Sequence, residues 1–254
     1  MFTKEYWNKR AQTYGHTGHA EPFYYCFDQQ ARLYAVNEVL ESLPITKNTV
    51  LDFGCGAGDF IDILKPHFEK IYAFDISEVV VAYAKQRFDQ PNIVISSDYN
   101  ELIYDPALDL ILTVTVLQSL TKEDLESIVK TLNASLSETG VLLCMEFFRE
   151  ADIRGNENEL KATTNEWKNI LAQNKLKIIR EINFYNPVTQ PTKSWYSYNT
   201  NLYLKIIKLF KKSGFAQAKF TEVAKKLIKK HKDVLLEKQS AFKIYHIQKE
   251  NSCN

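Results

Sequence analysis

The chain has 254 residues, of which 45% are hydrophobic and 25% are charged, and its formal net charge is +1. This length can bury one sizeable core, which favours a single α/β domain with an insertion over two equal domains. A charge so close to zero gives no overall argument for nucleic acid or a membrane surface, and no segment approaches the roughly 18 apolar residues of a membrane helix, so we expect a soluble, cytoplasmic protein without membrane insertion.

The cysteines also exclude a class of protein. Cys26, Cys55, Cys144 and Cys253 are scattered along the chain and form no C-x-x-C pair. We therefore expect reduced thiols, without a disulfide framework or a zinc site.

Residues 1–45 are expected to form a helical lid on the domain that follows. Apolar and aromatic side chains recur in this stretch, and most of them are expected to pack on the domain, with one or two lining a substrate pocket. They are Tyr24, Tyr25, Phe27, Tyr34 and Val36.

The most informative segment is an apolar run followed by an acid and three glycines at alternate positions, which predicts a buried strand ending in a nucleotide-binding turn. The acid is Asp52 and the glycines are Gly54, Gly56 and Gly58. Glycines let the backbone adopt positive φ angles and approach a ligand closely, while the acid favours a cationic or amine-bearing ligand over a pyrophosphate. The dinucleotide fingerprint G-x-G-x-x-G fails, because its third glycine is replaced by Asp59.

Strands and helices are predicted to alternate after this turn. The expected strands are Lys70–Phe74, Asn92–Ser96, Leu108–Val114 and Val141–Phe148, and the expected helices are Asp59–Phe68, Ser77–Phe88 and Thr121–Leu136. This alternation specifies right-handed crossovers and a parallel sheet.

The second half of the chain allows two interpretations. The first places a helix over Thr163–Asn174, a sixth strand over Leu176–Tyr185 and an antiparallel seventh strand over Ala241–Gln248. Residues 186–240 then form a helical, lysine-rich insertion that caps the active site. The alternative makes Asn201–Lys212 the helix before strand six and Phe215–Val223 that strand.

The pattern D-x-G-x-G-x-G from Asp52 to Gly58 resembles motif I of the class I S-adenosylmethionine-dependent methyltransferases. That resemblance implies a Rossmann-like, seven-stranded and mostly parallel sheet of order 3-2-1-4-5-7-6. It also implies a core over residues 46–185 and 241–250, with S-adenosyl-L-methionine as cofactor. The similarity covers roughly residues 5–148 with specific motifs, and the remainder only in outline.

The resemblance also assigns cofactor contacts. Asp75, about 20 residues past the turn, would bind both ribose hydroxyls, and Asp98 and Tyr99 would meet adenine. Thr115 would offer its carbonyl near the methionyl amine. The amino-terminal segment from Tyr6 to Tyr14 looks like one that many small-molecule members fold over the cofactor. The full expected set is Arg10, Tyr14, Asp52, Gly54, Cys55, Gly56, Gly58, Asp75, Ile76, Asp98, Tyr99 and Thr115.

Three side chains are candidates for a general base. Many relatives carry a histidine after strand four, but this chain has Val-Leu-Gln-Ser-Leu there. A hydroxyl acceptor would need a base, whereas an amine needs only to arrive deprotonated. The candidates are His16, His19 and Glu146. The two histidines are spaced like a metal pair, but no third ligand is adjacent, and either can be an ordinary loop residue, while Glu146 can simply cap a strand.

The acceptor is expected to bind the insertion. Trp195, Tyr196 and Tyr198 form an aromatic cluster that can line a pocket, together with Tyr24 and Tyr25, or form the core of the insertion. Lysines far outnumber acids in this region, which indicates either a solvated helix face or attraction of an anionic acceptor.

The sequence thus favours methyl transfer to an oxygen or nitrogen atom of a small, polar, anionic or sugar-like metabolite. Two alternatives stay open: a protein that binds S-adenosylmethionine without catalysis, and an RNA methyltransferase. The second is weaker, because no Asn/Asp-Pro-Pro-Tyr signature follows strand four. The oligomeric state is not predicted.

Overall fold

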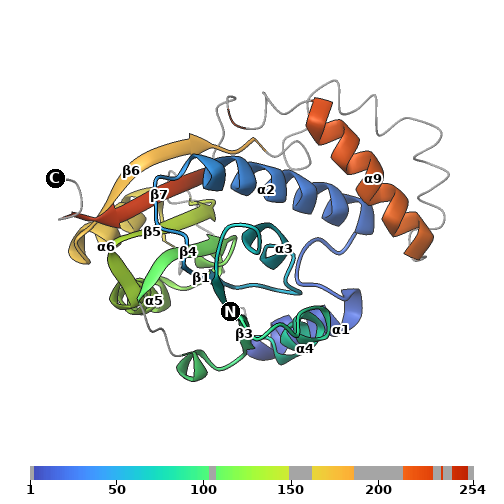
Figure 1. The fold of residues 1–254 in the computed structure, drawn as a ribbon, viewed down its shortest axis with the longest axis horizontal. Helices are drawn as coiled ribbons and strands as arrows, with labels where there is room; N and C mark the ends of the chain where they lie inside the picture. The colour runs from blue at the N-terminus through green and yellow to red at the C-terminus, as the bar shows by residue number, and fades with distance from the viewer. Residues whose placement is uncertain are drawn as a thin grey trace. The chain divides into compact units, whose positions relative to one another are not determined.

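The computed structural model describes residues 3–102, 107–148, 162–185, 214–230, 236 and 242–250 (Figure 1). Its helices are α1 (Lys4–Tyr14), α2 (Pro22–Ser42), α3 (Ile61–Leu64), α4 (Glu78–Arg87), α5 (Lys122–Ser135), α6 (Thr164–Gln173) and α9 (Gly214–Lys230). Two short 3-10 helices are η1 (Tyr99–Glu101) and η2 (Leu117–Ser119). The strands are β1 (Thr49–Phe53), β2 (Lys70–Phe74), β3 (Ile93–Ser96), β4 (Leu108–Val114), β5 (Leu136–Glu146), β6 (Leu176–Asn183) and β7 (Lys243–Lys249).

The chain divides into two compact units. The first comprises residues 1–17, 44–182 and 243–254, and it contains nearly all of the sheet. The second comprises residues 18–43 and 183–242, and it contains α2 and α9.

The sheet has seven strands in the order β3-β2-β1-β4-β5-β7-β6, which confirms the expected Rossmann-like fold. β1 pairs in parallel with β2 and β4, β2 pairs in parallel with β3, and β4 pairs in parallel with β5. β7 runs antiparallel to β5. All five residues of β1 are buried, as expected for a central strand of a parallel sheet covered on both faces.

The predicted helices follow from their caps and apolar spacing. Thr121 caps α5 by accepting a hydrogen bond from the Asp124 N–H, and Leu125, Val129 and Leu132 are buried at helical spacing. α6 begins with a capping box, in which the side chains and backbone of Thr163 and Glu166 bond reciprocally.

Two elements, α3 and β5, have a boundary that differs from the prediction by more than two residues. α3 is much shorter than the helix expected over Asp59–Phe68. β5 begins at Leu136, five residues before the expected start at Val141, because Leu136 already pairs with Leu108. The register then shifts, so that Leu110 pairs with Val141.

The alternative interpretation of the second half is wrong, because Phe215–Val223 belongs to α9 and β6 is Leu176–Asn183. In the second unit α9 packs against α2. Phe220, Ala224 and Ile228 of α9 are buried at helical spacing. Periodic burial of apolar side chains explains why this segment is a helix.

Candidate active site

The turn after β1 takes the conformation that its glycines allow. Gly54, Gly56 and Gly58 have φ values of 87°, 54° and 85°. The N–H groups of Gly54 and Cys55 both donate to the carbonyl of Phe74 in β2, at 2.7 and 2.9 Å. These bonds fasten the turn to the neighbouring strand.

The three glycines differ in the space around them. A Cβ on Gly54 would lie 2.1 Å from Cγ2 of Val116, and one on Gly58 would lie 2.7 Å from Cε2 of Phe88. Among the residues that the structure describes, a Cβ on Gly56 would meet only Oγ1 of Thr17, at 3.7 Å. Gly54 and Gly58 are thus required by packing, whereas the space beside Gly56 is open to a ligand.

Arg87 of α4 holds the turn from its other side. Its guanidinium donates to the carbonyl of Ala57 at 2.6 Å, to Asp59 at 2.8 Å and to Asp62 at 2.8 Å. Partial burial lowers the pKa of Arg87, but the bonds to Asp59 and Asp62 outweigh this and raise it overall. These three bonds of Arg87 fasten the turn to α4.

Asp75 links the two turns that follow β1 and β2. Its Oδ2 accepts a hydrogen bond from the Gly56 N–H at 2.9 Å, and its Oδ1 accepts one from the Ser77 N–H at 2.9 Å. Burial raises the pKa of this carboxyl, and the two backbone bonds lower it in part. Each oxygen keeps a further lone pair, so the carboxylate can still accept bonds from two hydroxyls.

Asp52 lies under the glycine turn with 1% of its surface exposed. Its Oδ2 is buried and accepts no hydrogen bond. Burial, with added repulsion from Asp75 and Asp59, raises the pKa of Asp52 to about 8. A buried carboxylate oxygen without a partner favours a ligand that brings positive charge or an N–H group.

The amino-terminal segment of the first unit lies beside this turn. Nε of Arg10 donates to the carbonyl of Thr17 at 2.8 Å, and the guanidinium lies 5.4 Å from the ring centre of Tyr14. The ring of Tyr14 stacks on His16, with 6.3 Å between centres. Because Thr17 is also the residue nearest to Gly56, this cluster and the glycine turn share one site.

Helix α1 is fastened to the start of α4. The hydroxyl of Ser77 donates to Oδ1 of Asn8 at 2.8 Å, and Lys4 forms an ion pair with Glu78. The N–H of Ser77 is the one that Asp75 accepts. The position of α1 is therefore tied to the proposed ribose-binding carboxylate.

Asp98 and Tyr99, which are expected at adenine, follow β3, and Ile76, another expected cofactor contact, follows β2. Ile76 is 44% exposed, directly after buried Asp75. Asp98 is exposed and caps η1 through the Asn100 N–H at 2.9 Å. The ring of Tyr99 contacts Phe74 edge-on with 5.5 Å between centres, and its hydroxyl bonds Ser135 at 3.2 Å. An exposed apolar side chain and a free carboxylate edge suit an aromatic base with an amino group.

The loop after β4 is organised by Glu146, the last residue of β5. Oε1 of Glu146 accepts bonds from the Thr113 hydroxyl and the Val116 N–H at 3.1 Å, and from the Leu117 N–H at 3.2 Å. Oε2 accepts the Gln118 N–H at 3.1 Å. Burial raises the pKa of Glu146 to about 7, although all four bonds lower it.

Other predicted residues are not brought into this unit. His19, Tyr24 and Tyr25 belong to the second unit, where Tyr24 is 38% exposed. Trp195, Tyr196 and Tyr198 lie outside the described residues. Cys55 is buried, and burial raises its thiol pKa, which makes it a packing residue in the turn.

Sequence reasoning missed Arg87, Thr17 and Val116. Arg87 stands at helical spacing on a predicted helix and gave no signal for its bonds to the turn. Val116 was noted only for the missing histidine. Glycine at a turn allows another part of the chain to pack closely against it, so the sequence indicates a contact at Gly54 but not that Val116 makes it.

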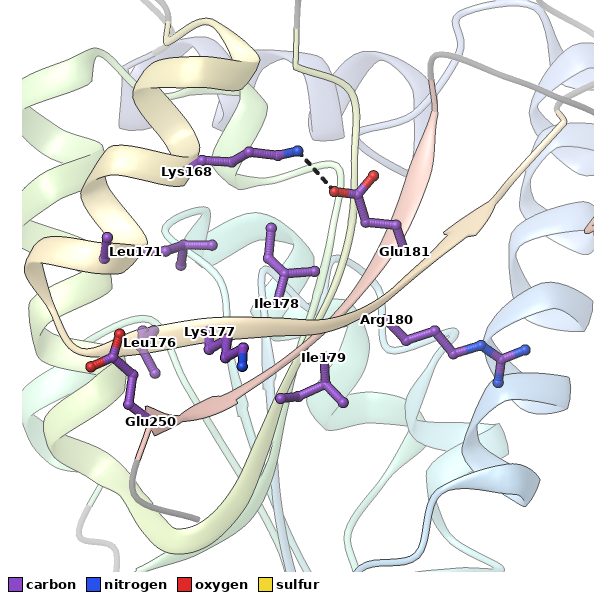
Figure 2. Close-up of a pocket in the computed structure, with 10 residues that line it drawn as sticks. Lys168, Leu171, Leu176, Lys177, Ile178, Ile179, Arg180, Glu181 and Glu250 are labelled. Atoms are coloured by element: carbon purple, nitrogen blue, oxygen red, sulfur yellow. Dashed lines mark ion pairs between the residues drawn. The ribbon is translucent and has the colours of Figure 1, made fainter. Parts of the chain in front are cut away.

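A hollow of about 720 Å³ lies elsewhere, between α6 and the edge strand β6 (Figure 2). Its floor includes Leu171, Leu176 and Ile178, and Lys168 and Glu181 form an ion pair of 3.0 Å at its rim. Strands β4, β5 and β7 separate β6 from β1 in the sheet, so the hollow is distinct from the glycine turn.

The described residues contain neither a metal-binding cluster nor a membrane-spanning helix. Within these ranges, no group of three or more His, Cys, Asp and Glu side chains could hold a metal ion. None of the helices in the described part of the chain is both long and apolar enough to cross a membrane.

Comparison with known proteins identifies the family. A model of the methyltransferase domain matches residues 25–186, which is more than half of the chain. No curated protein sequence matches at a significant level.

Solved structures share the fold at low sequence identity. An S-adenosylmethionine-dependent methyltransferase from Leishmania major has a TM-score of 0.57 at 16% identity, over 70% of this chain and 73% of that one. A cyclopropane synthase from Mycobacterium tuberculosis has 0.56 at 11%, over 90% and 94%. An O-methyltransferase from a polyketide synthase multienzyme of Brevibacillus brevis, bound to S-adenosyl-L-homocysteine, has 0.54 at 21%, over 87% and 72%. Together with its sheet order and glycine turn, the matched domain means that the chain belongs to the class I, Rossmann-like family of S-adenosylmethionine-dependent methyltransferases.

Proposed function

We propose that this methyltransferase acts on an oxygen or nitrogen atom of a small, polar acceptor that carries negative charge. The observation that carries the proposal is the cluster of Arg10, Tyr14, His16 and Thr17 beside Gly56. A segment folded over the glycine turn can exclude water from a small reaction site, which is what methyl transfer needs most.

The residues present fit the cofactor. Gly56 leaves open space at a positive φ, and a buried oxygen of Asp52 has no partner. We propose that Asp75 binds the ribose hydroxyls, that Asp98 and Ile76 hold adenine, and that the Thr115 carbonyl receives the methionyl amine. S-adenosylmethionine supplies a methyl group on a sulfonium, which a nucleophile can attack directly.

The chain has to orient the acceptor and, for a hydroxyl, to take its proton. Positioning alone can contribute about 7–11 kcal/mol to the rate. His16 is the favoured base, because its ring is held on Tyr14 in the segment that reaches Gly56. His19 is the second candidate. Glu146 is less suited, since both of its oxygens already accept hydrogen bonds and the residue has no exposed surface.

The second unit is proposed to set acceptor choice. Lys225, Lys226 and Lys229 of α9 are exposed, and this excess of positive charge supports an anionic acceptor. Lys226 is partly neutralised by Glu222, whose pKa is lowered to about 2 by bonds to Lys219 and Lys226. One solved structure of this fold, described as an O-methyltransferase, supports oxygen as the acceptor atom.

The decisive experiment supplies the protein with S-adenosylmethionine and pools of phosphorylated, carboxylated and neutral small molecules. Formation of S-adenosylhomocysteine identifies an active pool, and the mass of the product identifies the acceptor. Asp75→Ala should weaken cofactor binding by more than about 1.5 kcal/mol, because it removes charge-assisted bonds to the ribose. Cofactor binding without turnover in any pool would favour a non-catalytic binder, and a strongly salt-dependent complex with RNA would favour an RNA methyltransferase.

The base is tested on the acceptor so identified. If that acceptor is a hydroxyl, His16→Ala should lower the rate of the chemical step about 100-fold or more, with cofactor affinity unchanged, and His19→Ala should act much less. Losses below tenfold in both variants would mean an amine or an acceptor that arrives ionised.

A further inference from the structure

The carboxylate of Glu146 is buried and binds the backbone of the loop that follows β4. The N–H groups of Val116, Leu117 and Gln118 are consecutive, and all three donate to it. They form the first turn of η2, where backbone N–H groups have no partner within the helix. Glu146 therefore acts as an internal anion that satisfies this turn.

The loop needs such an anchor because its entry is strained. Thr115 has a φ of 58°, a left-handed conformation that is uncommon for a β-branched residue. Its N–H is held by the Met145 carbonyl at 2.9 Å, one residue before Glu146. Strained backbone of this kind persists only where surrounding bonds enforce it.

The loop also rests directly on the glycine turn. Val116 is the residue whose side chain fills the space where Gly54 would carry a Cβ. The N–H of the same Val116 is bonded to Glu146. The end of β5 is thereby connected to the turn after β1 through a single loop residue.

We propose that Glu146 is a positioning residue of the cofactor site, which holds the loop from Thr115 to Gln118 against Gly54. The part of this inference that concerns the cofactor rests on the proposed function. Both oxygens of the buried carboxylate accept hydrogen bonds from the loop and from Thr113. It acts through the backbone groups that it binds.

Three variants test this role. Glu146→Ala removes all four acceptor contacts. Glu146→Gln keeps one carbonyl oxygen, so it can preserve the three bonds made to Oε1 and lose only the bond from the Gln118 N–H. Glu138→Gln is the matched control, because Glu138 lies on the same strand but is 82% exposed at its side chain and pairs with Lys249 at 3.0 Å.

The first measurement is amide hydrogen exchange in the protein without cofactor. Exchange at Val116, Leu117 and Gln118 should be about tenfold faster or more in Glu146→Ala, because a bond to a charged group is lost at each amide. In Glu146→Gln the increase should be confined to Gln118. The control should match the wild-type protein.

The second measurement is calorimetry with S-adenosylhomocysteine. The dissociation constant should rise about tenfold or more in Glu146→Ala, rise less in Glu146→Gln and stay within about twofold in Glu138→Gln. Recovery by the glutamine variant separates positioning from a base, since glutamine cannot accept a proton at neutral pH.

Unchanged exchange in Glu146→Ala would overturn the proposal, as would faster exchange with unchanged affinity. If the alanine variant does not fold, the glutamine variant decides by the same two measurements, and a uniform rather than local increase in exchange would count against the proposal. Failure of the wild-type protein to bind S-adenosylhomocysteine would instead refute the proposed function, and the exchange data would still decide whether Glu146 anchors the loop.

Discussion

Alanine substitutions at Gly54 and Gly56 in the turn after β1, compared with one at Gly15 outside it, would measure how tightly that turn is packed. Alanine at Gly15, Gly54 or Gly56 forces a side chain into a backbone conformation that costs roughly 1–2 kcal/mol. Of these three positions, only Gly54 would bring the new Cβ into overlap with a neighbour, at 2.1 Å from Cγ2 of Val116. At Gly15 no heavy atom of the described residues would lie within 4 Å of the new Cβ. Overpacking should add about 1–3 kcal/mol to the cost at Gly54 alone.

The assay is thermal and urea unfolding of the protein without cofactor. In a chain of this size about 1 kcal/mol corresponds to roughly 2–4 °C in Tm. Gly15→Ala and Gly56→Ala should therefore each lower Tm by about 2–8 °C, and Gly54→Ala by on the order of 10 °C. Equal losses at Gly15 and Gly54 would refute the reasoning, because the contact with Val116 would then contribute nothing.

Further predictions concern charge, acceptor and turn. Asp52→Asn should stabilise the free protein more as pH rises. The pKa of Asp52 is about 8 in the folded protein and 3.8 as its ordinary value, so the stability linked to the protonated carboxyl is fully present below pH 3.8 and is lost as pH rises through 8. A Tm difference from wild type that stays constant between pH 5 and pH 9 would contradict this. Trp195→Ala combined with Tyr198→Ala should raise KM or lower kcat for the acceptor with nearly unchanged S-adenosylmethionine affinity; normal acceptor kinetics would leave the cluster a packing role. Arg87→Ala should weaken S-adenosylhomocysteine binding measured by calorimetry, because the carbonyl of Ala57 and two carboxylates lose their donor, whereas Lys85→Ala on the same helix should not.

The sheet could be predicted because each of its strands leaves a local signal. β1 and β4 are apolar runs of the length of a buried strand, and the acids or glycines that follow mark where each one ends. The start of β5 could not be predicted, because it depends on pairing between Leu136 and Leu108 across the sheet. Gly140 lies within β5, where a Cβ would be 2.7 Å from the Leu108 carbonyl.

Part of the candidate site could likewise be predicted from the sequence, and part of it could not. Asp75 and the glycines were found from spacing, since their relative positions follow from one βαβ unit. The proposed role of Glu146 could not be predicted, because one of its four partners lies in β4 and three lie in the loop that follows, about 30 residues away, and the sequence shows only a carboxylate at a strand end. Long-range hydrogen bonds leave no periodic pattern, so the sequence identified the acid but left a general base and a structural role both open.

The attachment of α1 has a consequence for the order in which the protein assembles. An isolated helix of eleven residues is barely stable in water, and the groups that fasten α1 to α4 lie 69 and 74 residues further along the chain. During synthesis α1 therefore leaves the ribosome long before Ser77 and Glu78 exist to receive it, and it docks only once β2 and the start of α4 have formed. Although α1 is translated before its partners, it is thus among the last elements of its unit to dock, and the cluster of Arg10 and Tyr14 beside the glycine turn forms late.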